Sequence, residues 1–261
     1  MWKAWAFIKR DLAIDVSYRL SFVLEGVHAL TAVAAFYFFS HLLGQARPQG
    51  YASFPFILVG IAVNAYMITC FVCFSQAIRG SQAAGTLKLI LATPTSPGTF
   101  LLCSSAYPFM RASVDAGAYL AAGVLFGLPL GHVNLPAVAL VFVLSLLAFS
   151  GIGILSATFT LVFRRGDPLL WLFGSGSWLL GGVLYPVDML PNALQRVSNL
   201  LPITHAVDGM RAALLGDASP AMIAGDLQAL ALFALLGFPT SVLVFSLGID
   251  HERRVGSLDH R

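Results

Sequence analysis

The sequence predicts an all-α polytopic membrane protein with six transmembrane helices, and three observations lead to this fold class. Hydrophobic residues make up 58% of the 261 residues and charged residues only 10%, whereas soluble domains average about 25% charged residues. Six apolar stretches approach or exceed the roughly 20 residues that cross a bilayer. The basic residues collect in alternate gaps between these stretches. One transmembrane domain over residues 1–261 is therefore expected, without a separate soluble domain.

The six predicted spans follow the apolar stretches. They cover residues 21–43, 54–78, 99–128, 135–163, 168–186 and 222–249. With a cytoplasmic N-terminus, the inside gaps carry eleven Lys and Arg residues, the outside gaps carry three, and Arg111 lies within a span, which accounts for all 15. Because cytoplasmic loops are enriched in basic residues, both termini are predicted to be cytoplasmic. The first stretch is too long for the core of a signal peptide, about 7–15 residues, so it is expected to remain as a helix.

An amphipathic helix is predicted over residues 1–20. Large apolar residues recur in it every three or four positions, at Trp2, Trp5, Ile8, Leu12 and Val16. With charged residues between them, this is the pattern of a helix that lies in the membrane interface. Two interpretations are open: the helix is a topological anchor, or it is a lever that joins a cytoplasmic partner to the first span.

A short cytoplasmic helix is predicted in the gap between the second and third spans, residues 79–98. The apolar run Leu87–Ala92 stands between Gly85 and Pro94, and glycine and proline are strong punctuation of regular structure. About two helical turns cannot cross the membrane, but they offer a docking surface to a partner in the cytosol. A plain connecting loop is the alternative.

Small residues crowd the fifth apolar stretch, which predicts close helix packing or a pathway that opens and closes. They are Gly174, Ser175, Gly176, Ser177, Gly181 and Gly182. The following residues 187–221, here called the outer cap, are too apolar for an exposed loop. Backbone at membrane depth has to be helical or buried against protein, so two short re-entrant helices divided near Pro202 are predicted.

Polar residues within the spans mark a candidate pathway and a candidate charge pair. The pathway residues are Asn64, Tyr66, Thr69, Ser75, Ser175, Ser177 and Tyr185. Arg111 and Asp115 lie four residues apart and so share a face of the third span. Pairing offsets part of the cost of a lone charge in the membrane, about 2.5–3.5 kcal/mol on insertion scales. A structural or cavity-lining pair is predicted.

Catalytic residues and metal ligands are not predicted in this chain. The sequence offers no phosphate-binding loop, paired catalytic carboxylates, metal-ligand cluster or nucleophile elbow. Cys70 and Cys73 fall within a span, where helix packing explains them better than redox or metal chemistry. His205, Asp208 and Arg211 share a helix face in the outer cap and are interpreted as cap contacts. The chain itself is expected to bind no cofactor and no nucleic acid.

Two stretches resemble the ABC-2 family of ABC transporter permeases, which are the membrane subunits of type-2 ABC exporters. The first is Gly85–Pro94, similar to the family's coupling helix between the second and third spans. The second, similar to the family's signature at the outer end of the fifth span, runs from Gly182 through Tyr185, Pro186, Pro191 and Pro202 to Arg211. Their order and spacing, the six spans and the N-terminal helix extend the resemblance over essentially the whole chain.

The resemblance implies a permease subunit of an ATP-driven exporter in a bacterial-type cytoplasmic (inner) membrane. Two copies, or one copy and a sibling permease, would pair among membrane lipids with ABC ATP-binding subunits that carry ATP and Mg. Coupling to the ATPase falls to Thr86, Leu87, Lys88, Leu89 and Leu91, and the outer-cap signature to Pro186, Pro191, Pro202 and Arg211. Arg79, Gln82 and Lys88 stand where the family commonly has acidic residues, which implies a partner with an acidic groove.

The family handles lipid-like, amphiphilic, drug and glycan substrates by alternating access. The scattered polarity of the candidate pathway favours a lipid-like or amphiphilic cargo, because a strongly anionic one would meet more basic residues at mid-depth than Arg111. Two other classes are open. An ion-gradient-driven secondary transporter needs ion-binding groups near mid-membrane and often an inverted repeat. A membrane-embedded lipid enzyme needs a polar cluster, for which Glu25 with His28 is the candidate.

Overall fold

The computed structural model describes residues 19–42, 48–83, 85, 97–129, 131, 133–163, 168–216 and 220–255, and all regular structure in these ranges is helical. The α-helices are α2 (Arg19–Leu42), α3 (Ser53–Ala83), α5 (Pro97–Leu125), α6 (Leu135–Phe163), α7 (Pro168–Leu180), α8 (Asn192–Ser198), α9 (Pro202–Leu215), α10 (Pro220–Leu232) and α11 (Phe238–Val255). Single 3-10 turns lie at η1 (Pro48–Gly50) and η2 (Val187–Met189), and a π-helical turn, η3 (Phe233–Gly237), joins α10 to α11. The prediction of an all-α fold is confirmed for this part of the chain.

Three of the described helices are long and apolar enough to cross a membrane: Ser53–Ala83, Leu135–Phe163 and Ile223–Asp250. The first has 31 residues, which gives a length of about 46 Å at 1.5 Å per residue against a hydrocarbon core of about 30 Å. Helices α2, α5 and α7 lie where the remaining spans are predicted. The structure thus supports a polytopic membrane protein, while the number of six spans stays a prediction.

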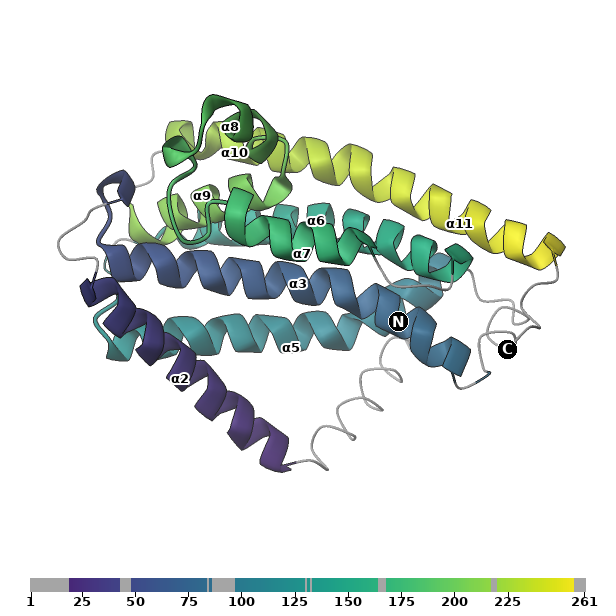
Figure 1. The fold of residues 1–261 in the computed structure, drawn as a ribbon, viewed down its shortest axis with the longest axis horizontal. Helices are drawn as coiled ribbons and strands as arrows, with labels where there is room; N and C mark the ends of the chain where they lie inside the picture. Colours follow the sequence, from purple (N-terminus) through teal and green to yellow (C-terminus); the bar gives the residue numbers. More distant parts are fainter. Residues whose placement is uncertain are drawn as a thin grey trace.

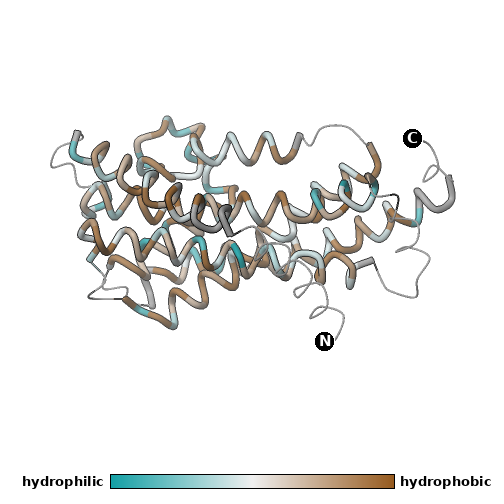
Figure 2. The backbone as a smooth tube through the Cα atoms, turned by 90° about the horizontal axis from the view of Figure 1, so that it is seen from below, coloured by the Kyte–Doolittle hydropathy of each residue, from teal (hydrophilic) through white to brown (hydrophobic). Residues whose placement is uncertain are grey.

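Helix α3 lies at the centre of the bundle, with α5, α6, α7 and α9 packed around it (Figure 1). It is buried along most of its length, because its sequence is apolar on every face rather than on one stripe. Figure 2 shows that hydrophobic residues predominate along the helices, with hydrophilic positions in short patches. Helix α11 packs on α6, on the side of that helix away from α2.

Helices α3 and α6 approach each other closely because one glycine and two serines lie between them. A Cβ atom on Gly153 of α6 would lie 2.6 Å from the Cys70 carbonyl oxygen of α3, so no larger residue fits without displacing a backbone. One turn further along, the hydroxyls of Ser75 and Ser156 are 2.8 Å apart in a buried hydrogen bond. Small and hydroxyl residues are the usual contacts between membrane helices.

Helix α2 meets the bundle near one end only. Its Tyr37 ring packs edge-on against Phe54, at 5.2 Å between ring centroids, and in a tilted arrangement against Phe126, at 5.1 Å. These contacts join the C-terminal part of α2 to the start of α3 and the end of α5. Toward its own N-terminus α2 diverges from both helices (Figure 1). The space between the three helices is therefore a wedge.

The observed helix ends differ from two predicted boundaries. Helix α7 ends at Leu180, so residues 181–186 of the predicted fifth span form an irregular turn instead. Helix α3 continues to Ala83, five residues beyond the predicted end of the span at residue 78, so Arg79 is part of this helix. In the outer cap, α8 and α9 are two short helices, and α9 begins at Pro202, where its missing N–H is tolerated.

Candidate functional site

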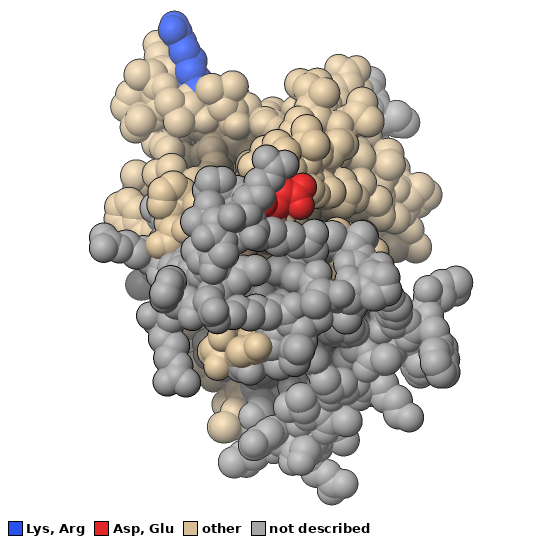
Figure 3. All heavy atoms as spheres, turned by 90° about the vertical axis from the view of Figure 1, so that its right-hand side faces the viewer, with Lys and Arg blue, Asp and Glu red and all other residues tan. Residues whose placement is uncertain are grey.

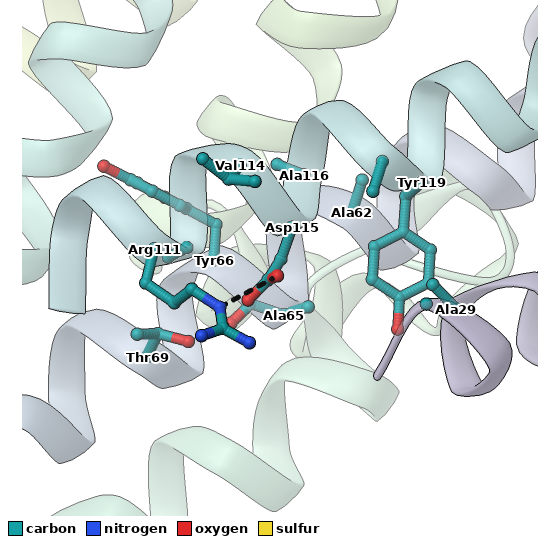
Figure 4. Close-up of a pocket in the computed structure, with 13 residues that line it drawn as sticks. Ala29, Ala62, Ala65, Tyr66, Thr69, Arg111, Val114, Asp115, Ala116 and Tyr119 are labelled. Atoms are coloured by element: carbon teal, nitrogen blue, oxygen red, sulfur yellow. Dashed lines mark hydrogen bonds and ion pairs between the residues drawn. The ribbon is translucent and has the colours of Figure 1, made fainter. Parts of the chain in front are cut away.

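The wedge between α2, α3 and α5 contains a cavity of about 340 Å³ (Figure 4). Its walls are mostly alanine and glycine, with a few polar side chains. The lining residues are Gly26, Ala29, Ala62, Ala65, Tyr66, Thr69, Arg111, Ala112, Val114, Asp115, Ala116, Ala118 and Tyr119. The volume is at the lower end of small-molecule sites, which span about 300–1,000 Å³.

Arg111 and Asp115 form an ion pair in the wall of this cavity. Arg111 Nε lies 3.5 Å from Asp115 Oδ1, one turn further along α5, and Figure 4 shows the two side chains reaching toward each other. The Arg111 side chain is 16% exposed and that of Asp115 is 49% exposed. The pair therefore lies at the cavity surface rather than deep in the core, and it adds polarity to the wedge without adding net charge.

Of the predicted pathway residues, the structure places Tyr66 and Thr69 in the wall of the wedge. Both are on α3, opposite α5. The Thr69 hydroxyl donates to the Ala65 carbonyl at 3.1 Å, which is the usual way for a helix to satisfy a hydroxyl. The Tyr66 ring points away from the Arg111–Asp115 pair in Figure 4.

The other predicted pathway residues lie elsewhere. The Ser177 hydroxyl of α7 donates to Asn64 Oδ1 of α3 at 2.7 Å, and both side chains are buried. Ser75 pairs with Ser156 of α6. Ser175 is exposed on α7, and the Tyr185 hydroxyl donates to the Leu179 carbonyl. Asn64, Ser75 and Ser177 thus join helices, and in this structure they do not line the wedge.

The outer cap is fastened to α3 by Arg211, whose side chain is 1% exposed. Its Nε donates to the Phe56 carbonyl at 3.1 Å, Nη1 to the Gly182 carbonyl at 2.8 Å and Nη2 to the Val183 carbonyl at 2.8 Å. Asp208 lies 3.5 Å from Nη1. The guanidinium also stacks on the Phe56 ring, at 3.3 Å from the centroid.

This arrangement has a clear local cause. Helix α7 stops at Leu180, Gly182 takes a φ of +65°, and the carbonyls of the following turn have no helical partners. Arg211 carries five N–H donors in a fixed fork. Two of its hydrogen bonds go to carbonyls of this turn, those of Gly182 and Val183. Burial lowers the pKa of Arg211 to about 9, which still leaves the group charged at neutral pH. Of the predicted cap residues, Pro186 and Pro202 are buried with Arg211, whereas Pro191 is exposed.

A second contact joins the outer cap to α10. His205 Nδ1 lies 2.9 Å from Asp226 Oδ1, and Nε2 lies 3.0 Å from the Asn199 carbonyl oxygen. The hydrogen bond with Asp226 is the main reason why the pKa of His205 is raised. Burial raises the pKa of the neighbouring Asp208. His205, Asp208 and Arg211 therefore make cap contacts, and Arg211 anchors the cap to α3 through three carbonyls, a role that the sequence did not reveal.

The predicted coupling residues Thr86, Leu87, Lys88, Leu89 and Leu91 lie outside the described residues, as does the predicted interfacial helix up to residue 18. Figure 3 views the molecule from the end where α3 and α11 finish, and the described surface there is largely uncharged. Within the described ranges, no group of three or more His, Cys, Asp or Glu side chains could hold a metal ion.

Comparison with known proteins gives consistent results. The family model described as ABC-2 type transporter matches residues 4–215. Nodulation protein J of Sinorhizobium fredii is 27% identical over 202 residues, covering 75% of this chain and 74% of its own. The inner membrane transport permease YadH of Escherichia coli K12 is 24% identical over 189 residues, covering 72% and 73%. Nodulation protein J of Neorhizobium galegae is 41% identical over 64 residues, 24% of each chain.

Proposed function

The chain belongs to the ABC-2 type transporter family, and we propose that it is the permease subunit of an ATP-driven exporter. The observation that carries this proposal is the family match across residues 4–215, which includes the wedge, the coupling segment and most of the outer cap. Members of this family are the membrane components of transporters and generally work with an ATP-binding subunit. ATP hydrolysis is therefore assigned to a separate subunit, and this chain is proposed to form the transmembrane pathway for the substrate.

The structure supports a specific division of labour within the permease. Helix α3 begins at the outer cap, where Arg211 bonds to the Phe56 carbonyl in its first turn. It ends at Ala83, shortly before the predicted coupling residues, which begin at Thr86 in the sequence. Helix α2 contacts α3 and α5 at one end and leaves a wedge at the other. A force applied near residues 86–91 would act on the C-terminal end of α3, and nucleotide binding would then shift the population between inward- and outward-open states.

The wedge also bears on the class of cargo. Its wall is largely alanine and glycine, with an ion pair of no net charge and the hydroxyls of Thr69 and Tyr119. Such a surface suits a lipid-like or amphiphilic molecule that slides between helices. A second permease copy, identical or related, would complete the membrane assembly in an inner membrane, with both termini in the cytoplasm.

The coupling role is tested by replacing Leu89 or Leu91 with Asp in the chain reconstituted with its ATP-binding subunit. If these residues dock on the ATPase, both variants should insert normally but lose substrate-stimulated ATP hydrolysis and transport together. The matched control is Leu200→Asp, which places the same charge on an exposed leucine of the outer cap. That variant should keep coupled activity.

Two outcomes would contradict the proposal. Unchanged substrate-stimulated ATPase activity in Leu89→Asp and Leu91→Asp would discard the docking role of the coupling segment. Transport by the purified chain with no ATP-binding subunit present would favour an ion-gradient-driven transporter instead. A gradient of protons or sodium across the proteoliposome would then drive uptake, whereas ATP would have no effect.

A further inference from the structure

A second cavity, of about 210 Å³, lies between α3, α5, α6 and α9 of one copy of the chain and opens to its surface beside Ser113 and Gly117, which are exposed. It adjoins the wedge, since Ala62, Tyr66 and Ala116 border both. Its wall is mostly apolar and includes Phe142, Phe149 and Met210. No charged side chain lines it. For scale, an apolar cavity of about 150 Å³ accommodates a benzene molecule.

Two hydroxyl groups in this wall make no hydrogen bond of standard length and angle within the described part of the chain. They belong to Tyr66, whose residue is 5% exposed, and Ser145, which is 3% exposed. Buried hydroxyls normally find a partner, and serine or threonine on a helix usually bonds the carbonyl one turn back. Ser113, which lines the same cavity, does so with Phe109 at 2.8 Å. Ser145 is the exception among the serines of this wall, and the Tyr66 hydroxyl has the Ser113 hydroxyl as a polar neighbour without a bond of standard geometry.

The position of these hydroxyls limits what can satisfy them. Tyr66 is 13 residues after the start of α3 at Ser53, and Ser145 is 10 residues after the start of α6 at Leu135. At 1.5 Å per residue they lie about 20 Å and 15 Å along their helices, close to the middle of a hydrocarbon core of about 30 Å. A lipid headgroup does not reach this depth, so the matching polar atom has to be carried on an apolar body.

We propose that this cavity binds an aliphatic chain or small ring that bears one hydroxyl or carbonyl oxygen, with Tyr66 and Ser145 as its hydrogen-bonding partners. The apolar wall takes up the hydrocarbon part, and the tyrosine hydroxyl donates to the ligand oxygen. The serine hydroxyl donates to the same oxygen or accepts from a ligand hydroxyl. Because all of the lining residues belong to one chain, this binding does not depend on the proposed transport function or on the ATPase.

The experiment uses the purified full-length chain in detergent micelles and two photoactivatable probes. One is an octanol that carries an aliphatic diazirine, and the other is the same molecule without the hydroxyl. After irradiation, labelled residues are mapped by peptide mass spectrometry and labelling is titrated against unlabelled 1-octanol. Saturable labelling should fall on the parts of α3, α5 and α6 around the cavity, and the alcohol should bind more tightly than the hydrocarbon.

Three variants test the role of the hydroxyls. Tyr66→Phe and Ser145→Ala should each weaken labelling by the alcohol about threefold to tenfold, the usual worth of one neutral hydrogen bond, and leave labelling by the hydrocarbon unchanged. Thr160→Ala is the matched control: its hydroxyl is buried on α6 and also unpartnered within the described residues, at 2% exposure, but does not line the cavity. It should have no effect.

A fourth variant tests the space itself. Gly117 lines the cavity, and a Cβ atom added there meets nothing within 4 Å, so Gly117→Leu should reduce labelling by both probes without disturbing the fold. The proposal is overturned if no saturable labelling occurs, which would leave water as the partner of the hydroxyls. It is also overturned if the two probes bind equally, or if Thr160→Ala weakens labelling as much as Tyr66→Phe and Ser145→Ala.

Discussion

Two arginines of the same chain lie in contrasting environments. Arg211 is 1% exposed and donates to three backbone carbonyls while stacking on a phenyl ring. Arg111 is 16% exposed, lies in the wall of a cavity of about 340 Å³ and pairs with a half-exposed carboxylate 3.5 Å away. The first arginine fixes a turn, a cap helix and the start of α3 to one another. The second leaves room around it.

The two environments distinguish a tightly bonded region, around Arg211, from a loosely packed region, around the wedge. Around Arg211 every displacement breaks several hydrogen bonds at once, and a buried charge that loses its partners is strongly destabilising. Around the wedge, α2 touches the bundle mainly through Tyr37 and its neighbours. The residues that line the wedge are mostly alanine and glycine. Four experiments sharpen or break this contrast.

The largest effect is expected from Arg211→Met. The substitution leaves the carbonyls of Phe56, Gly182 and Val183 buried without their donor, and each buried acceptor left without a donor costs about 1–3 kcal/mol. Thermal unfolding of the purified chain in detergent should show a large drop in Tm. Arg196→Met, at an exposed position of α8, should change stability by less than about 0.5 kcal/mol. Equal melting temperatures for Arg211→Met and the wild type would show that Arg211 does not stabilise the attachment of the outer cap to α3.

The next effect comes from the glycine beside that arginine. A Cβ atom on Gly60 would lie 2.3 Å from the Val183 carbonyl oxygen and 2.7 Å from Arg211 Nη2. Overpacking of this kind costs about 1–3 kcal/mol, so Gly60→Ala should lower Tm. Gly80→Ala, on the same helix with nothing within 4 Å, should raise stability by about 0.5–1 kcal/mol. If Gly60→Ala behaved like Gly80→Ala, the close approach of α3 to the turn would be disproved.

A smaller effect is expected at the wedge, from Arg111→Gln and Asp115→Asn. Each single change removes one charge of the ion pair and its attraction to the other charge, whereas the double change removes both charges. A double-mutant cycle should therefore give a coupling of about 0.5–1 kcal/mol, with the double variant more stable or more active than the sum of the singles requires. Unfolding in a graded detergent series and transport both measure this. Strictly additive losses would mean that the two side chains act separately.

The smallest effect concerns pH. Asp226 raises the pKa of His205 above its ordinary value of 6.5, so the folded state binds that proton more tightly than the unfolded one. The resulting stability is fully present below the unfolded pKa and is lost as pH rises through the folded pKa. Tm should fall from pH 6 toward alkaline pH by an amount worth at most about 1 kcal/mol. Asp226→Asn should flatten this slope, and an unchanged slope would contradict the assignment.

The sequence predicted well those features that depend on local composition and spacing. The all-α membrane fold and the family follow from long apolar runs and short motifs, and the comparisons support both. The fourth apolar stretch coincides with α6, at residues 135–163. Arg111 and Asp115 are close because a spacing of four places any two residues on one helix face. The end of α7 was missed, since Gly181 and Gly182 were counted as part of an apolar span.

The candidate pathway was harder to predict, because polarity alone does not say which way a side chain faces. Asn64 and Ser177 carry the same signal in the sequence as Tyr66 and Thr69. Yet the first two meet each other between helices, 113 positions apart in the sequence, and the other two line a cavity. A serine that bonds to a neighbouring helix and a serine that faces a ligand are identical until the helices are packed.

The sequence by itself determined that the chain is an all-α membrane protein and to which family it belongs, because these properties depend on hydropathy and short motifs. Only the tertiary structure decided that Arg211 reaches Phe56, a residue 155 positions away, that the wedge opens beside Arg111, and that Tyr66 and Ser145 share one cavity. Such contacts depend on how helices cross and on the small residues that let them approach, and that geometry arises only when the whole bundle has packed.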